Sequence, residues 1–132
     1  MTILPVRVLG AVALGGALGS LARFGLSMAF PHPPGGFAVS TVLVNVTGCL
    51  CIGVLYTVTA HPLWRAFLGV GVLGGYTTYS TAVLDALQAV RTGHWLTAFG
   101  YTFGTLAACL LAVAAGIRLA RAFRPSTRSG EE

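Results

Sequence analysis

The sequence predicts an all-α integral membrane protein in which one domain crosses the bilayer with four helices. Only 8% of its 132 residues are charged, whereas 55% are hydrophobic; a soluble domain carries about 25% charged residues. The apolar residues form four runs, each close to the roughly 20 residues that one helix needs to cross a bilayer. This composition excludes an ordinary soluble enzyme and a nucleic-acid-binding protein, and it makes the lipid bilayer the expected surroundings.

Short breaker segments separate the four runs. The first run ends in the Pro- and Gly-rich segment 31–36, and the second stops at His61-Pro62. Because the connections are so short, we expect consecutive helices to be antiparallel neighbours. The expected spans are 8–30, 37–60, 66–90 and 95–119, followed by a flexible polar tail at 120–132.

The charges predict how these spans are oriented. All eight basic residues are Arg, and four of them fall between positions 118 and 128. With four spans both termini lie on one side, and the excess of Arg near the C-terminus favours the cytoplasmic side. We therefore expect a multi-pass protein of the cell membrane.

Glycine is unusually frequent, with 18 residues. Small residues four apart let helix backbones approach closely within lipid. Several pairs have nearly this spacing, and four helices of this size enclose little volume, so we also expect oligomerisation. The pairs are Gly15/Gly19, Gly71/Gly75, Gly100/Gly104 and Gly48 followed by Gly53.

Two polar features interrupt the apolar spans. Asn45 lies in the middle of the second span with Thr41 one turn earlier, and its amide serves either as interhelical glue or as a functional donor. Segment 69–81 of the third span combines four glycines with Thr and Ser, which predicts either a broken helix or a bent helix packed through glycine. Backbone carbonyls freed at such a break can coordinate a hard cation such as sodium.

The remaining polar side chains favour an anion pathway over a cation or proton pathway. Tyr101, Thr105 and Cys109 recur every four residues in the fourth span, and Arg23 lies near the end of the first. Asp85 is the only acid in the apolar region. The sequence holds no nucleophile with a matching base and no phosphate loop, so we expect no enzyme.

Three ordered motifs resemble the fluoride channel family known as CrcB or Fluc. Residues 15–24 resemble its first-helix motif GGxxGxxxR(Y/F), residues 44–48 its VNxxG motif, and residues 74–81 its GGxTTFST signature. The resemblance implies an antiparallel, double-barrelled dimer of four-helix subunits. Such a dimer conducts fluoride passively and protects the cell from accumulated fluoride.

The same resemblance assigns roles to individual residues. A structural sodium ion, which is not transported, would be held at the dimer interface by the backbone carbonyls of Gly74 and Thr77. The implied fluoride pathway consists of Asn45 as the pore amide, Arg23 at the mouth, and Thr41, Tyr79, Ser80, Tyr101 and Thr105. Hydroxyl and amide donors suit fluoride, because a small and strongly hydrated anion needs replacements for its water.

Two departures leave the assembly open. Tyr79 replaces the first pore Phe of the family signature, and Ala82 replaces the second. A degenerate pore fits one half of a heterodimer as well as a homodimer, and it also fits a non-conducting accessory subunit. A small proton-coupled multidrug transporter is the alternative from another class, and Asp85 would then be its essential carboxylate.

Overall fold

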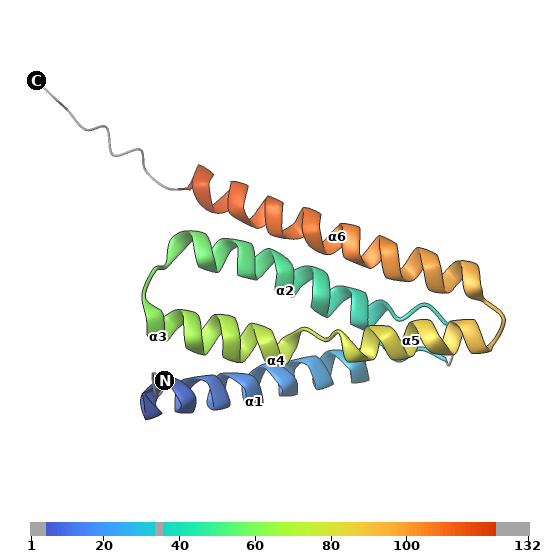
Figure 1. Cartoon of the computed structure of the whole chain (residues 1–132), viewed down its shortest axis with the longest axis horizontal. Helices are drawn as coiled ribbons and strands as arrows, with labels where there is room; N and C mark the ends of the chain where they lie inside the picture. The colour runs from blue at the N-terminus through green and yellow to red at the C-terminus, as the bar shows by residue number, and fades with distance from the viewer. Residues whose placement is uncertain (1–4, 34–35, 124–132) are drawn as a thin grey trace, which may run out of the picture.

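The computed structural model describes residues 5–33 and 36–123, and every regular element in these ranges is a helix (Figure 1). Three of the helices, α1, α2 and α6, are long and apolar enough to cross a membrane. The prediction of an all-helical, multi-pass membrane protein is therefore confirmed. The elements are α1 (Val6–Ala29), α2 (Val39–Val58), α3 (Pro62–Trp64), η1 (Arg65–Leu73), α4 (Gly74–Tyr76), α5 (Ser80–Arg91) and α6 (Trp95–Ala122).

The segment between α2 and α6 forms a fourth rod that is interrupted near its middle. Figure 1 shows α3, η1, α4 and α5 following one another along the bundle, with a non-helical link between α4 and α5. The helix stops at Thr77, whose backbone is extended (φ −78°, ψ 158°), and resumes at Ser80. The interruption falls inside segment 69–81, where the sequence predicts a broken helix. Helix η1 just before it is widened to the π form, which is common at functional sites.

Glycines set the spacing between the helices. A Cβ added at Gly19 of α1 would overlap the backbone oxygen of Val72, and one at Gly75 would overlap the backbone oxygen of Gly16. On the other side of the bundle, a Cβ at Gly53 of α2 would overlap a backbone oxygen of α6. These backbones therefore touch directly, as the small-residue spacing predicts.

One predicted glycine pair makes no such contact within the chain. Gly100 and Gly104 of α6 have no heavy atom within 4 Å of an added Cβ. The contact between α6 and α2 instead uses Gly116, whose added Cβ would overlap the backbone oxygen of Leu50. Gly100 and Gly104 have the spacing that a close helix contact needs, but their face of α6 points away from α2.

The ends of the spans differ from the predicted ones by a few residues. Helix α6 continues to Ala122 rather than ending at 119, so the polar tail begins later than predicted; its residues 124–132 lie outside the described part. The third segment begins at Pro62, because Pro is well tolerated at a helix start and His61 precedes it in extended conformation. Helix α1 begins and α6 ends at the same end of the bundle (Figure 1), which agrees with both termini lying on one side.

The burial pattern is that of a protein surrounded by lipid. Except for Tyr101, the buried side chains of the described residues are small, such as Ala66, Ala98 and Ala112, whereas Leu21 and Leu111 are 67% and 72% exposed. Without water around the helices, large apolar residues gain nothing from being inside, and close backbone packing replaces a hydrophobic core.

Candidate functional site

The side chain of Asn45 holds the interruption of the third rod in place. Its Nδ2 donates to the backbone oxygen of Thr78 at 2.8 Å, and its Oδ1 accepts from the backbone N–H of Thr78 at 2.8 Å. Asn45 therefore satisfies both backbone groups of a residue that belongs to no helix, which matters where water is scarce. Because an amide NH2 has two hydrogens, one donor of Asn45 is left for another ligand.

The hydroxyl of Thr78 continues this network into α5. It donates to Oγ1 of Thr81 at 2.9 Å, accepts from the backbone N–H of Thr81 at 3.2 Å, and lies 3.4 Å from Oγ of Ser80. Thr78 is only 7% exposed. The predicted pathway residues Asn45 and Ser80 are thus joined through Thr78, which the sequence analysis had not singled out.

These bonds also change the surroundings of the two carbonyls predicted to bind sodium. In an unbroken α-helix the carbonyl of Gly74 would accept from Thr78 N–H, and that of Thr77 from Thr81 N–H. Here Asn45 Oδ1 takes the first N–H, and Thr78 Oγ1 takes the second. Both carbonyls have thereby lost their usual helical partners, and Gly74 is exposed on the surface of the chain.

A second polar cluster surrounds Asp85 on α5. Its Oδ2 accepts from Thr41 Oγ1 of α2 at 2.9 Å and from the Tyr101 hydroxyl of α6 at 3.3 Å. Its Oδ1 lies 3.4 Å from Nε2 of His32, in the connection between α1 and α2. The family resemblance implies that Thr41 and Tyr101 bind fluoride, whereas in the structure both hydroxyls donate to this carboxylate.

A cavity of about 220 Å³ lies beside both clusters. Arg23 of α1 lines it together with Thr41 of the Asp85 cluster and Thr78 of the interruption. The other lining residues are Ser20, Phe24, Ser27, Val44 and Thr81. A guanidinium among hydroxyl groups makes this cavity attractive to a small anion.

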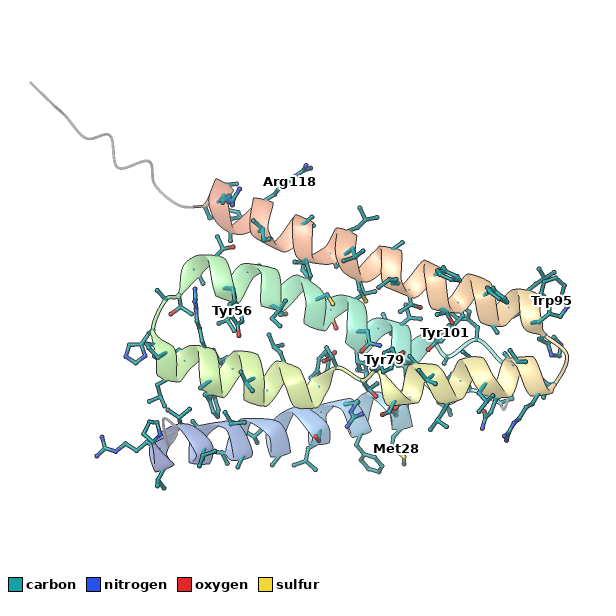
Figure 2. All side chains as sticks on the ribbon, viewed as in Figure 1. Met28, Tyr56, Tyr79, Trp95, Tyr101 and Arg118 are labelled. Atoms are coloured by element: carbon teal, nitrogen blue, oxygen red, sulfur yellow. The ribbon has the colours of Figure 1, made fainter. Side chains whose placement is uncertain are left out.

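Two predicted pathway residues stand apart from these clusters. Tyr79 lies at the interruption (Figure 2) and is 84% exposed. Thr105 lies one turn beyond Tyr101 on α6, is half-buried, and makes no side-chain hydrogen bond with the described residues. The single chain therefore gathers Asn45, Ser80, Thr41, Tyr101 and Arg23, but leaves Tyr79 and Thr105 outside the polar clusters.

The contact between Asp85 and His32 is not apparent from the sequence. The sequence indicates a role for Asp85 only in a multidrug transporter, and it indicates none for His32. The sequence does contain one indication: the only carboxylate in an apolar region needs hydrogen-bond donors around it. Which donors these are depends on contacts across 44 and 53 residues of sequence, and no local pattern reveals them.

Comparisons with known proteins agree on one family. The family described as "CrcB-like protein, Camphor Resistance (CrcB)" matches residues 10–117, a range that includes both polar clusters. The chain is 52% identical over 113 residues to "Fluoride-specific ion channel FluC 2" of Thermobifida fusca, covering 82% of this chain and 84% of the relative. It is 44% identical over 119 residues to the protein of the same name in Nocardia farcinica (86% and 85% covered). It is 42% identical over 113 residues to "Fluoride-specific ion channel FluC" of Paracoccus denitrificans (83% and 91% covered).

Proposed function

The chain belongs to the CrcB family, and from this premise we propose that it is a fluoride-specific ion channel of the cell membrane. It is then no enzyme, and its activity is passive fluoride efflux, which gives resistance to fluoride. The observation that best supports this role is the cavity lined by Arg23, Thr41 and Thr78, the last of which Asn45 holds through its backbone. It offers a fixed positive charge and hydroxyl groups at membrane depth, the kinds of group that a dehydrated anion needs. The hydroxyls of Thr41 and Thr78 donate to Asp85 and Thr81 here, so they would turn toward the ion when it binds.

A fourth span and a dimer belong to the same proposal. The interrupted rod from α3 to α5 runs beside α1 (Figure 1), and we propose that it crosses the membrane as the fourth span. Tyr79, Gly74 and the Gly100/Gly104 face of α6 are open on the single chain. A second subunit in antiparallel orientation would cover such surfaces and bring Tyr79 to a pathway. The second subunit is either a copy of this chain or a homologous partner.

We further propose a structural sodium ion between the subunits. The carbonyls of Gly74 and Thr77 fit this role, because the N–H groups that would normally bond them are taken by Asn45 and Thr78. A hard cation prefers oxygen ligands, and unwound carbonyls in membrane proteins supply them. The ion would supply charge that holds the two interrupted rods together, and it would not be transported.

Removing sodium is expected to destabilise the assembled protein. Purified protein is melted in sodium chloride and in the chloride of a large organic cation, at equal ionic strength. A ligand at 100 times its Kd stabilises the folded state by about 2.7 kcal/mol, so we expect a clearly higher Tm in sodium that rises with its concentration. Equal melting temperatures in both salts would contradict a bound sodium ion.

The proposed function is tested by fluoride efflux from liposomes containing the purified chain, measured with a fluoride electrode. We expect efflux of fluoride and retention of chloride. Efflux by the chain alone supports a homodimer, and efflux only after co-expression with a homologous partner supports a heterodimer. An accessory role is tested by co-expressing this chain with a partner subunit that a mutation has inactivated. If that mutation removes all fluoride flux, this chain does not conduct.

The same liposome assay distinguishes the channel from the alternative function, a multidrug transporter. Both oxygens of Asp85 already have partners, Thr41 and Tyr101 on one and His32 on the other. A carboxylate with these partners is poorly placed to bind an organic cation. Uptake of organic amines driven by a proton gradient, with no fluoride efflux, would replace the channel by the transporter.

A further inference from the structure

The contact between His32 and Asp85 has no role in the proposed conduction of fluoride. The side chain of Asp85 is 11% exposed, and Nε2 of His32 lies 3.4 Å from its Oδ1. Thr41 and Tyr101 bond only Oδ2. His32 is therefore the group, among the described residues, that contacts Oδ1 and that can neutralise the carboxylate.

His32 is held in a position where solvent protons reach it. It follows Pro31 and precedes Pro33, and proline restricts both its own backbone and that of the preceding residue. Its side chain is 25% exposed, more than twice the exposed fraction of Asp85. The loop thus presents an accessible imidazole to a carboxylate that is largely shielded.

The other charged and titratable groups around Asp85 do not replace this contact. The Tyr101 hydroxyl faces Asp85 from α6 and donates to Oδ2, and α2 contributes the neutral Thr41. Arg23 of α1 lines the cavity that Thr41 also lines, and Arg91 is exposed at the end of α5. His94, before α6, lies 3.1 Å from the Thr92 hydroxyl.

We propose that His32 is a positioning residue that makes fluoride conduction sensitive to protons. The inference rests on the proposed function. Protonated His32 forms an ion pair with Asp85 through Oδ1 and cancels the negative charge beside the hydroxyls of Thr41 and Tyr101, which bond Oδ2. Neutral His32 leaves that charge in place, and it repels an anion in the cavity that Thr41 lines.

Conduction therefore increases as the pH falls through the range in which histidine ordinarily gains its proton, about pH 8 to 5. Removing one like charge about 6 Å from an anion increases its local population about threefold even in a dielectric as high as that of water. The change is greater where water is scarce.

The first test measures fluoride efflux from liposomes at equal internal and external pH, between pH 8 and 5.5. Leakage from protein-free liposomes is subtracted. For the unmodified chain, with its partner subunit if one is needed, we expect efflux to rise by about threefold or more. We expect efflux through His32→Gln to stay at the low rate that the unmodified protein shows at high pH. Efflux through His32→Arg should stay at the high rate that the unmodified protein shows at low pH. His61→Gln is the matched control in another loop, and it keeps the unmodified profile.

A flat profile in the unmodified protein, or the same rise in His32→Gln, overturns the inference. A second measurement does not depend on conduction. Histidine is isotopically labelled, the His32 signals are identified by their loss in His32→Gln, and they are compared by NMR between the unmodified protein and Asp85→Asn at the low-pH end of the range.

We expect the His32 signals to differ in Asp85→Asn, because Nε2 of His32 lies 3.4 Å from Oδ1 of Asp85 in the unmodified protein. Equal signals in the two proteins overturn the inference even if fluoride is conducted. A difference in a protein that conducts no fluoride at any pH supports the ion pair and refutes the channel.

Discussion

Asn45→Asp is expected to abolish fluoride flux. The substitution keeps an acceptor for the Thr78 N–H, but it removes the donor that bonds the Thr78 oxygen at 2.8 Å. Leaving a buried carbonyl unsatisfied costs about 1–3 kcal/mol. The new carboxylate also places a negative charge beside the cavity through which we propose that fluoride passes.

A like charge at about 4 Å costs roughly 4 kcal/mol at an effective dielectric of 20, so flux should fall by about 100-fold or more. Efflux from liposomes measures the loss, and size-exclusion chromatography shows whether the protein is still assembled. Thr57→Val is the matched control on α2, because the Thr57 hydroxyl donates only to the Gly53 oxygen of its own helix. Unchanged flux in Asn45→Asp would remove Asn45 from the mechanism.

Gly19→Ala is expected to cause the largest loss of stability. Its Cβ would overlap the backbone oxygen of Val72 and lie 2.8 Å from the backbone nitrogen of Tyr76. Both obstacles are backbone atoms, which cannot rotate away as a side chain can, so α1 must move away from the interrupted rod. Overpacking of this kind costs about 1–3 kcal/mol and sometimes more.

Gly25→Ala on the same helix is the matched control. An added Cβ there meets no heavy atom within 4 Å, and Ala exceeds Gly in helix propensity by about 1 kcal/mol. Thermal melting of the purified proteins should therefore show opposite signs, a lower Tm for Gly19→Ala and an equal or higher one for Gly25→Ala. Equal shifts in both variants would contradict the close contact of α1 with the rod.

The glycine pairs illustrate how far sequence reasoning reaches. Spacing alone predicts Gly15/Gly19 and Gly71/Gly75 as contact surfaces, and the structure brings these two surfaces together. The same spacing predicts Gly100/Gly104, which meets nothing within the chain, and it misses Gly116. Spacing along a helix defines a face, but the partner of that face is set by how the other helices pack.

The same holds for the polar residues: the sequence identifies them, but helix packing decides their partners. The cost of polar groups in lipid singles out Asn45, Arg23 and the interrupted third rod from the sequence alone. Their partners are not local: Asn45 meets Thr78 across 33 residues, and His32 meets Asp85 across 53. Because the Asp85 carboxylate accepts from the hydroxyls of Thr41 and Tyr101, the proposed anion pathway also contains an acid, which the sequence alone does not indicate.

The sequence by itself determined the membrane class, the approximate positions of the helices, the interruption of the third helix and the family. Each of these depends on hydropathy, breakers or motifs that are read within a few dozen neighbouring residues. Only the tertiary structure decided which donors face Asn45, Gly74, Thr77 and Asp85. A hydrogen bond requires two groups within about 3 Å, and that distance between remote residues exists only after the helices have packed.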